Sequence, residues 1–368
     1  MKFPESNEFV YIIGNNGSGK SRALEENAQR LCDTKKVVVI ASGVSDKFKF
    51  RSQTRKTSNG YYRYLGNRTV GNGTHNGTLA ANAVLLFLAI LESELSSKFK
   101  NFLVSIEFDE KIGIGYRKKK NSKTNPFDTQ ELTKDFVTLN RDMLATKERP
   151  FEIVFFKKGT PHPFSDLSSG EQYIITTALK IVASIEEGVC YFIDEPEVSL
   201  HVEWQIKWPD LFHPLLSLKR GVNSYIATHS PVIISSALKA NAECYSLLNN
   251  TLFKISGEEF NVERILFKSF NTLTPDNKYV FEELASIVTR VVDHLSAESL
   301  NDLEDDVPAF APLESVEKFK AELRYASRVD EDDEFIQSTL EDFEMAIKDL
   351  ISMPKRDEFH PTMPEDET

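Results

Sequence analysis

Residues 167–201, LSSGEQYIITTALKIVASIEEGVCYFIDEPEVSLH, decide the fold of this chain. A serine and glycine turn opens the stretch, and apolar residues then recur at spacings of three and four from Tyr173 to Val182, which is the period of an amphipathic helix. A short apolar strand, residues 189–193, runs directly into Asp194 and Glu195. Because ligands in open α/β folds bind where parallel strands end, we expect these two carboxylates at the ligand-binding edge of a sheet.

A second motif, GNNGSGKS at residues 14–21, follows an apolar strand at residues 9–13. It matches the phosphate-binding pattern GxxxxGK[ST], in which glycines let backbone N–H groups surround a phosphate, Lys20 adds a positive charge and Ser21 binds Mg²⁺. We expect a helix over residues 22–31, with the positive end of its dipole toward the anion. The two motifs together predict a nucleotide site.

His229 follows a third apolar strand, residues 224–228, and precedes Ser230 and Pro231. Proline disfavours a helical conformation in the residue before it, so we expect His229 on a loop at the same edge of the sheet. A lone histidine is usually structural. One placed beyond such a strand, in a chain with a P-loop, favours a sensor of the γ-phosphate.

The composition is that of a globular protein. A length of 368 residues suits one large or two modest domains, and a hydrophobic content of 40% supplies a sizeable core. The longest apolar run, residues 79–91, is too short for a membrane span, and no targeting peptide is recognisable before the first strand. Cys32, Cys190 and Cys244 lack the spacing of a zinc site. These features predict a cytoplasmic protein with reduced thiols and no membrane partner.

The segment from Ser45 to Arg68 is strongly basic, with seven basic side chains and one acidic side chain, and it includes three tyrosines. Basic side chains interleaved with aromatic ones can bind nucleic acid through phosphate contacts and stacking. An alternative interpretation is a solvated loop folded over the phosphates of ATP. A second basic patch, residues 117–120 with Lys123, is typical of a solvated hairpin tip.

The C-terminal region is acidic. Residues 293–368 carry 23 acidic and 7 basic side chains, in a chain whose net charge is −12. Amphipathic patterns predict helices near residues 277–295, 313–327 and 332–352. The acids at 330–333 lie in this helical context, so we expect no nuclease centre in the chain. The tail either docks a basic partner or keeps the assembly soluble.

The rest of the pattern predicts elements around the nucleotide site. They are a buried strand at 37–41, a loop at 59–77, a helix at 78–99, an antiparallel pair formed by 102–116 and 151–157, a helix at 128–145, and short strands at 244–248 and 251–255.

Four motifs in a fixed order carry a resemblance to a known family: GNNGSGKS, LSSGEQ, CYFIDEPEVSLH and ATHSP. Together they resemble the ABC-type ATPases, in the branch that contains SMC, RecF and OLD-family proteins. The resemblance implies an α/β fold, namely a P-loop ABC ATPase core with a mostly parallel sheet, an antiparallel β element, a helical insertion and an acidic helical C-terminal region. The implied domains are an ATPase at 1–250, with its insertion at roughly 45–150, and a C-terminal region at 251–368.

The resemblance also implies ligands and roles. ATP and Mg²⁺ are the implied cofactors, with Ser21 and Asp194 at the metal, Glu195 polarising the attacking water and His229 sensing the γ-phosphate. The implied nucleotide-binding residues are Gly14, Asn15, Asn16, Gly17, Ser18, Gly19, Lys20, Ser21, Arg22, Ser168, Ser169, Gly170 and Glu171. In this family the serine and glycine turn acts on ATP bound to a second protomer, which implies a homodimer. The alternative for this turn is an ordinary helix N-cap.

Two features depart from the family pattern. Only 13 residues precede the P-loop, so the antiparallel strands usual there are missing or are replaced by residues 102–116. No Q-loop glutamine is secure, because Gln53 lies within the basic segment.

Three functions are compatible with these motifs. The ATHSP and EPEVSLH sequences are similar to the ATPase subunits of anti-phage operons such as the Septu systems, which favours an ATPase that regulates a separately encoded effector, for instance a nuclease. The basic segment favours the alternative of a DNA-repair or chromosome-maintenance clamp. The same two motifs disfavour the cytoplasmic subunit of an ABC transporter.

Overall fold

The structure is a computed structural model, and it describes residues 2–4, 8–43, 46–68, 76–116, 129–140, 142, 144, 151–256, 260–270, 272, 278–299, 312–326 and 334–352. The chain forms two compact units, Met1–Val262 and Glu263–Thr368. The basic patch at 117–120 with Lys123, the acidic run at 330–333 and Ser45 lie outside the described residues.

An eight-stranded sheet forms the centre of the first unit. Its strands in spatial order are β12 (Thr251–Lys254), β11 (Glu243–Leu248), β1 (Phe9–Ile13), β10 (Asn223–Thr228), β9 (Val189–Asp194), β2 (Lys36–Ala41), β4 (Tyr61–Tyr64) and β3 (Arg55–Lys56). The strands from β11 to β4 run parallel, and β12 and β3 pair antiparallel at the two edges. The expected mostly parallel sheet is therefore confirmed.

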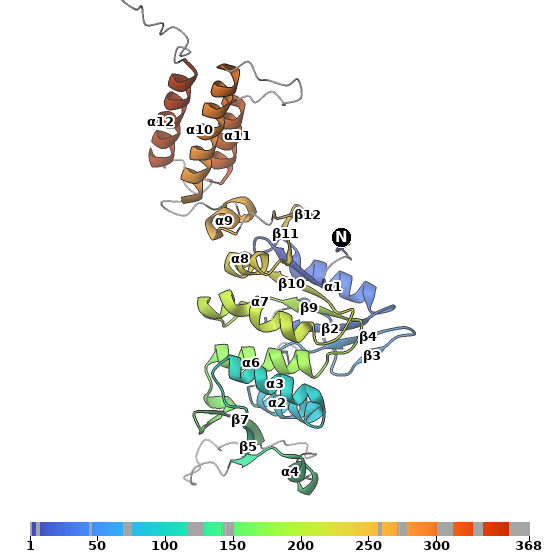
Figure 1. The fold of residues 1–368 in the computed structure, drawn as a ribbon. Helices are drawn as coiled ribbons and strands as arrows, with labels where there is room; N and C mark the ends of the chain where they lie inside the picture. The colour runs from blue at the N-terminus through green and yellow to red at the C-terminus, as the bar shows by residue number, and fades with distance from the viewer. Residues whose placement is uncertain are drawn as a thin grey trace, which may run out of the picture. The chain divides into compact units, whose positions relative to one another are not determined.

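Helices cover both faces of this sheet (Figure 1). On one face Leu24 of α1 packs in the same core cluster as Val10 of β1. Tyr11, the next residue along β1, points to the opposite face, where its ring meets the edge of Trp208 and its hydroxyl lies 2.8 Å from Nε2 of His213. The covering helices are α1 (Lys20–Leu31), α6 (Ser169–Val182), α7 (Val202–Leu216) and α8 (Pro231–Lys239).

A second sheet of four antiparallel strands also belongs to the first unit. Ile112 to Tyr116 pair with Phe155 to Phe151, which confirms the antiparallel pairing expected between these two segments. Helix α2 packs on β7, and α3 packs on α6. The elements are α2 (Asn76–Ile90), α3 (Glu94–Ser105), β5 (Ile112–Tyr116), β6 (Gln130–Glu131), α4 (Lys134–Leu139), β7 (Phe151–Lys157), β8 (Thr160–Pro163) and the 3-10 turn η1 (Phe164–Asp166).

The prediction of a loop over residues 59–77 is wrong in part, because strand β4 lies within this segment. Tyr62 and Tyr64 are buried on the α1 side of the sheet, and β4 pairs in parallel with β2. The backbone partner that makes this segment a strand lies more than twenty residues away in the sequence, and the local composition of glycine, asparagine and threonine conceals it.

The helix expected at 78–99 is wrong as one continuous element. Helix α2 ends at Ile90, and α3 begins at Glu94 because Ser93 caps it, with its side chain accepting the Leu95 N–H at 3.3 Å. Helix α3 then continues to Ser105, so residues 102–105 are helical and the strand begins only at Ile112.

The helix expected at 128–145 is also wrong in part. Its described portion contains β6 and the short helix α4, whose N-cap is Thr133. The sequence analysis did not predict helices α7 and α8, nor the helix α9 (Val262–Phe270). Helix α7 contains Pro209 and Pro214, residues that usually interrupt a helix.

The second unit is helical in its described part. Its helices are α9 (Val262–Phe270), α10 (Lys278–Ser299), α11 (Pro312–Ala326) and α12 (Glu334–Ser352). Their buried side chains form one apolar cluster, with Ile287, Val291, Leu323 and Ile347 at most 1% exposed. The amphipathic helices expected near these positions are therefore confirmed. Among the described residues, no helix combines the length and apolar character that a membrane span requires.

Candidate nucleotide site

The P-loop connects the end of β1 to the first residue of α1, and its glycines are required by its shape. Gly17 and Gly19 have φ angles of +80° and +94°, in the left-handed region that favours glycine. A Cβ atom on Gly14 would lie 2.9 Å from the backbone carbonyl oxygen of Leu247. The loop can therefore approach a ligand closely with its backbone, as the motif predicts.

Lys20 lies inside this loop. Its side chain is buried, and Nζ donates to the carbonyl oxygens of Gly14 at 2.7 Å and Asn15 at 3.1 Å. Burial lowers the pKa of Lys20, while the negative charge of Asp194 acts in the opposite direction. The buried Oγ of Ser18 has no hydrogen-bond partner among the described residues. A buried cation in the same loop as an unsatisfied buried hydroxyl fits a phosphate.

Asp194 ends β9, between β2 and β10, and its side chain is buried. Its Oδ1 accepts a hydrogen bond from Oγ of Ser21 at 3.1 Å, so the two predicted metal ligands are brought together from positions 173 residues apart. Burial raises the pKa of Asp194 to about 7, with a further contribution from Glu195, and the Ser21 hydrogen bond opposes this rise. A divalent cation would offset this charge, and two adjacent oxygen donors suit Mg²⁺.

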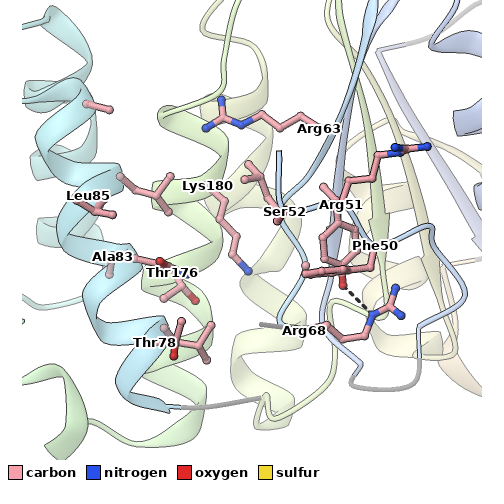
Figure 2. A pocket seen from close by; sticks show the side chains of 17 residues that line it. Phe50, Arg51, Ser52, Arg63, Arg68, Thr78, Ala83, Leu85, Thr176 and Lys180 are labelled. Carbon is pink, nitrogen blue, oxygen red and sulfur yellow. Dashed lines mark hydrogen bonds between the residues drawn. The ribbon is translucent and has the colours of Figure 1, made fainter. Parts of the chain in front are cut away.

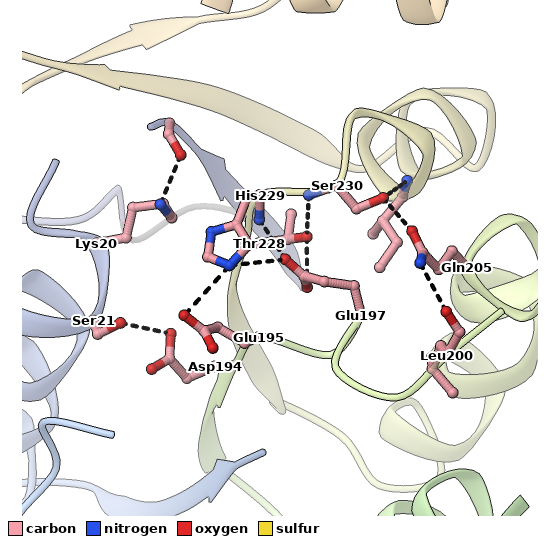
Figure 3. Close-up of polar contacts among 12 residues, drawn as sticks. Lys20, Ser21, Asp194, Glu195, Glu197, Leu200, Gln205, Thr228, His229 and Ser230 are labelled. Carbon is pink, nitrogen blue, oxygen red and sulfur yellow. Dashed lines mark hydrogen bonds and ion pairs between the residues drawn. The ribbon is translucent and has the colours of Figure 1, made fainter. Parts of the chain in front are cut away.

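Glu195, the next residue, lies just past the end of β9 in a left-handed backbone conformation. Its φ is +53°, which is uncommon outside glycine, and its N–H donates to the carbonyl of Ala227 at 2.9 Å. Its side chain is 30% exposed, and Oε1 lies 3.4 Å from Nε2 of His229 (Figure 3). The strained turn therefore places an accessible carboxylate beside the buried Asp194.

His229 leaves the end of β10 and points toward this carboxylate (Figure 3). Its Nδ1 is buried without a hydrogen-bond partner among the described residues. Its Nε2 also lies 3.6 Å from Oε1 of Glu197. The structure thus brings Ser21, Asp194, Glu195 and His229 together at one edge of the sheet, as the sequence predicts.

Glu197 is a site residue that the sequence analysis did not single out. Its Oε1 accepts the backbone N–H of His229 at 2.5 Å, and its Oε2 accepts the hydroxyl of Thr228 at 2.8 Å (Figure 3). The sequence signal is the second glutamate of EPEVSLH, two residues after Glu195. Only the fold shows that its carboxylate holds the loop that carries His229.

The serine and glycine turn forms the N-terminus of α6. Ser168 and Glu171 make a capping box, in which the Ser168 side chain accepts the Glu171 N–H at 3.3 Å and the Glu171 carboxylate accepts the Ser168 N–H at 2.9 Å. Glu171 also pairs with Lys157. Ser168 and Ser169 are exposed, and Gly170 faces the carbonyl of Ser199, which a Cβ would approach to 3.2 Å. Within one chain the turn therefore acts as the N-cap of α6.

Three other residues predicted to bind the nucleotide, Asn15, Asn16 and Arg22, lie at the solvent-facing side of the P-loop. Asn15 and Asn16 are exposed. Arg22 is also exposed, and its Nε donates to Glu26 one turn further along α1 at 2.9 Å. The guanidinium of Arg22 is thus engaged within its own helix.

The P-loop, the acids at the end of β9 and the loop that carries His229 meet at one edge of the mostly parallel sheet, which is the arrangement of a P-loop nucleotide site. Residues 76–235 match a family model described as "AAA domain, putative AbiEii toxin, Type IV TA system". The match includes α6, β9 and His229, and the P-loop precedes it. No curated protein matches the chain.

Several solved structures are similar to the chain at low identity. A structure from a study of ATP-driven dimerization and DNA-stimulated activation of SMC ATPases has a TM-score of 0.28 and 12% identity, and covers 49% of this chain and 91% of its own. An inward-facing putative metal-chelate type ABC transporter has a TM-score of 0.32 and 12% identity, with coverages of 72% and 79%. An SMC head bound to the C-winged helix domain of ScpA has a TM-score of 0.35 and 13% identity, with coverages of 69% and 91%.

Proposed function

We propose that two copies of this chain hydrolyse ATP in composite sites, and that this cycle controls a separately encoded effector in anti-phage defence. The observation that carries the catalytic part is the convergence of Ser21, Asp194, Glu195 and His229 at one edge of the sheet.

Each side chain has a distinct task in this proposal. The P-loop N–H groups and Lys20 bind the phosphates, and Ser21 with Asp194 would hold Mg²⁺, an ion that would supply positive charge to offset charge on the phosphates. Glu195 is accessible and accepts a proton from the attacking water, while Asp194 is buried and stays with the metal. His229 donates to the γ-phosphate from the loop that Glu197 fixes.

The catalytic assignment is tested with Glu195→Gln. The variant keeps the size of the side chain but loses the proton acceptor, so we expect ATP binding to persist and turnover to fall by about a hundredfold or more. Light scattering with ATP and Mg²⁺ should show the variant accumulating as a dimer. Glu203→Gln, at an exposed acid on α7, is the matched control. Unchanged turnover in Glu195→Gln contradicts the assignment.

The composite site is tested by complementation between two inactive variants. Lys20→Ala removes the phosphate-binding charge, and Ser168→Asp places a negative charge on the exposed turn while keeping a good N-cap residue. A mixed dimer contains one intact site, formed by the P-loop of one protomer and the turn of its partner. An equimolar mixture should recover about a quarter of wild-type activity, because half of the random dimers are mixed and each has one intact site of two. No recovery argues against sites shared between protomers.

The effector role is supported by the EPEVSLH and ATHSP motifs and by the matched family, whose description names a putative toxin of a Type IV TA system. Affinity purification after expression of the native operon tests it. We expect a neighbouring gene product to co-purify in a nucleotide-dependent manner, and its absence under every nucleotide condition overturns the proposal.

The alternative of a DNA clamp is less well supported. Tyr62 and Tyr64 are buried, and the hydroxyl of the half-buried Tyr61 donates to Glu186, so these rings do not form an open stacking surface. Arg68 pairs with the buried Asp46. Strongly salt-dependent DNA binding by the purified protein would nevertheless favour the clamp over the effector role.

A further inference from the structure

A pocket of about 530 Å³ lies in the first unit, separate from the nucleotide site. Figure 2 shows helices α2 and α6 on one side of it and residues 50–68 on the other. None of the residues that line the pocket belongs to the P-loop, to the end of β9 or to the histidine loop. Its volume is typical of sites for small molecules.

Four basic side chains line this pocket, and three of them, Arg51, Arg63 and Lys180, make no salt bridge to a described residue. Lys180 of α6 is 7% exposed, and the one hydrogen bond of its ammonium group to a described residue is to Oδ1 of Asn67 at 2.7 Å. The guanidinium of Arg63 makes no hydrogen bond or salt bridge to any described residue, although Glu186 lies within electrostatic range of it. Arg68 also lines the pocket and is paired with Asp46. No acidic side chain is among the described residues that line the pocket.

A buried ammonium group with one neutral partner is costly, because its desolvation is poorly compensated. An anion in the pocket would give Lys180 the charged partner that it lacks, and the guanidinium of Arg63, which lines the same pocket, is suited to bidentate contact with a phosphate.

The part of the lining that α2 contributes is largely apolar. It includes Leu79, Ala83 and Leu86 with the polar Thr78 and Asn82, and the hydroxyl groups of Ser52 and Thr176 lie on other elements of the lining. A ligand that fits this pocket therefore carries an anionic group at one end, an apolar or planar body at the other and polar atoms between them. Nucleotides combine these features, whereas a long acyl chain has no polar atoms for the hydroxyl groups of the pocket.

We propose that this pocket binds a small phosphate-bearing ligand of the nucleotide class, with its phosphate between Lys180 and Arg63 and its base against α2.

A chain of hydrogen bonds connects the pocket to the catalytic acids. Lys180 donates to Asn67, Asn67 Nδ2 donates to the carbonyl of Ser42 at 3.2 Å, and the Ser42 N–H donates to the carbonyl of Asp194 at 3.2 Å. A ligand that draws Lys180 away from Asn67 would therefore alter ATP turnover. This effect on turnover rests on the proposed ATPase, whereas binding in the pocket does not.

Binding is measured by calorimetry on the full chain carrying Lys20→Ala, so that the P-loop does not contribute. The probes are 5′-AMP, 5′-GMP, the dinucleotide pApA, inorganic pyrophosphate and a single-stranded oligonucleotide. We expect saturable one-site binding of at least one of the first three. Adding Lys180→Met or Arg63→Gln should weaken this binding by about tenfold or more, the usual effect of removing a hydrogen bond to a charged group. Lys207→Met, at an exposed lysine of α7, should leave it unchanged.

Four outcomes overturn the proposal: no binding of any mononucleotide or dinucleotide, binding of pyrophosphate alone, binding of the oligonucleotide alone, or nucleotide binding that neither pocket variant weakens. Thermal unfolding of each variant shows whether it is folded. Arg63 is only half-buried, so Arg63→Gln still tests the site if Lys180→Met does not fold.

Discussion

The carboxylate of Glu197 accepts the backbone N–H of His229 at 2.5 Å, across 32 residues of sequence. The same carboxylate accepts the hydroxyl of Thr228, so both of its oxygens hold the loop at the end of β10. Glu197 is therefore a positioning residue for the histidine, and its replacement should affect turnover more than nucleotide affinity.

Glu197→Gln tests this relationship. A glutamine side chain has one acceptor oxygen, so it cannot accept from both the His229 N–H and the Thr228 hydroxyl, and at least one of these two hydrogen bonds is lost or reversed. We expect kcat to fall by about tenfold or more, the range for residues that orient a catalytic group, while the Kd for ATP changes little. A proportional loss of both constants, or a loss of folding, contradicts a specific positioning role.

A change of charge at Ser168 distinguishes the two roles considered for the serine and glycine turn, namely helix N-cap and contact with ATP on a partner protomer. Ser168→Asn and Ser168→Asp both keep an effective N-cap, and they differ by one negative charge. If the turn faces a phosphate of ATP on the partner, the aspartate variant should lose most ATPase activity, and the asparagine variant should retain much more. Equal activity in the two variants would leave the turn with its capping role alone.

Gly14 is restricted by the backbone around it. A methyl group at this position would lie 2.9 Å from the Leu247 carbonyl and 3.0 Å from Ser18 Oγ, so Gly14→Ala should displace the P-loop and abolish measurable ATP binding. Gly159→Ala is a matched control, since Gly159 has a φ of +77° with no atom within 4 Å of the added methyl group. The control should lower stability by about 1 kcal/mol through backbone strain and leave ATP binding intact. Calorimetric ATP titration and thermal unfolding measure both effects.

Lys180 should make stability depend on pH. Burial lowers its pKa from 10.5 to about 7, so between these values the unfolded chain binds more protons than the folded chain and stability rises with pH. The cost of the buried charge is complete below about pH 7 and is relieved as the pH rises toward the unfolded value. The other charged side chains among the described residues that line the pocket are Arg51, Arg63 and Arg68, and all three are positive.

Lys180→Met should therefore unfold at a higher temperature than the wild type. This difference in unfolding temperature should be largest at about pH 6.5 and smaller at about pH 9. Removing the hydrogen bond to Asn67 adds an offset that does not vary with pH. Lys207→Met should show no such trend, because this side chain is exposed. A difference between Lys180→Met and the wild type that is constant with pH refutes the buried-charge account.

The sequence by itself determined the nucleotide site. The strand, glycine loop and helix around Lys20, and the apolar strand that ends in Asp194 and Glu195, are set by local turn chemistry and short-range periodicity, which act within about ten residues of chain. The parallel sheet followed from the same signals, because continuous apolar strands indicate burial on both faces.

Only the tertiary structure decided which distant groups meet. Strand β4 exists because β2 supplies its hydrogen-bond partners, and Glu197 acts on His229 because β9 and β10 are neighbours in the sheet. In the sequence, Lys180 is one polar residue among others on an amphipathic helix. Only the fold shows that α2 and residues 50–68 surround a pocket with it. Pairing and burial of this kind depend on contacts between segments far apart in the chain, and no local pattern of residues encodes them.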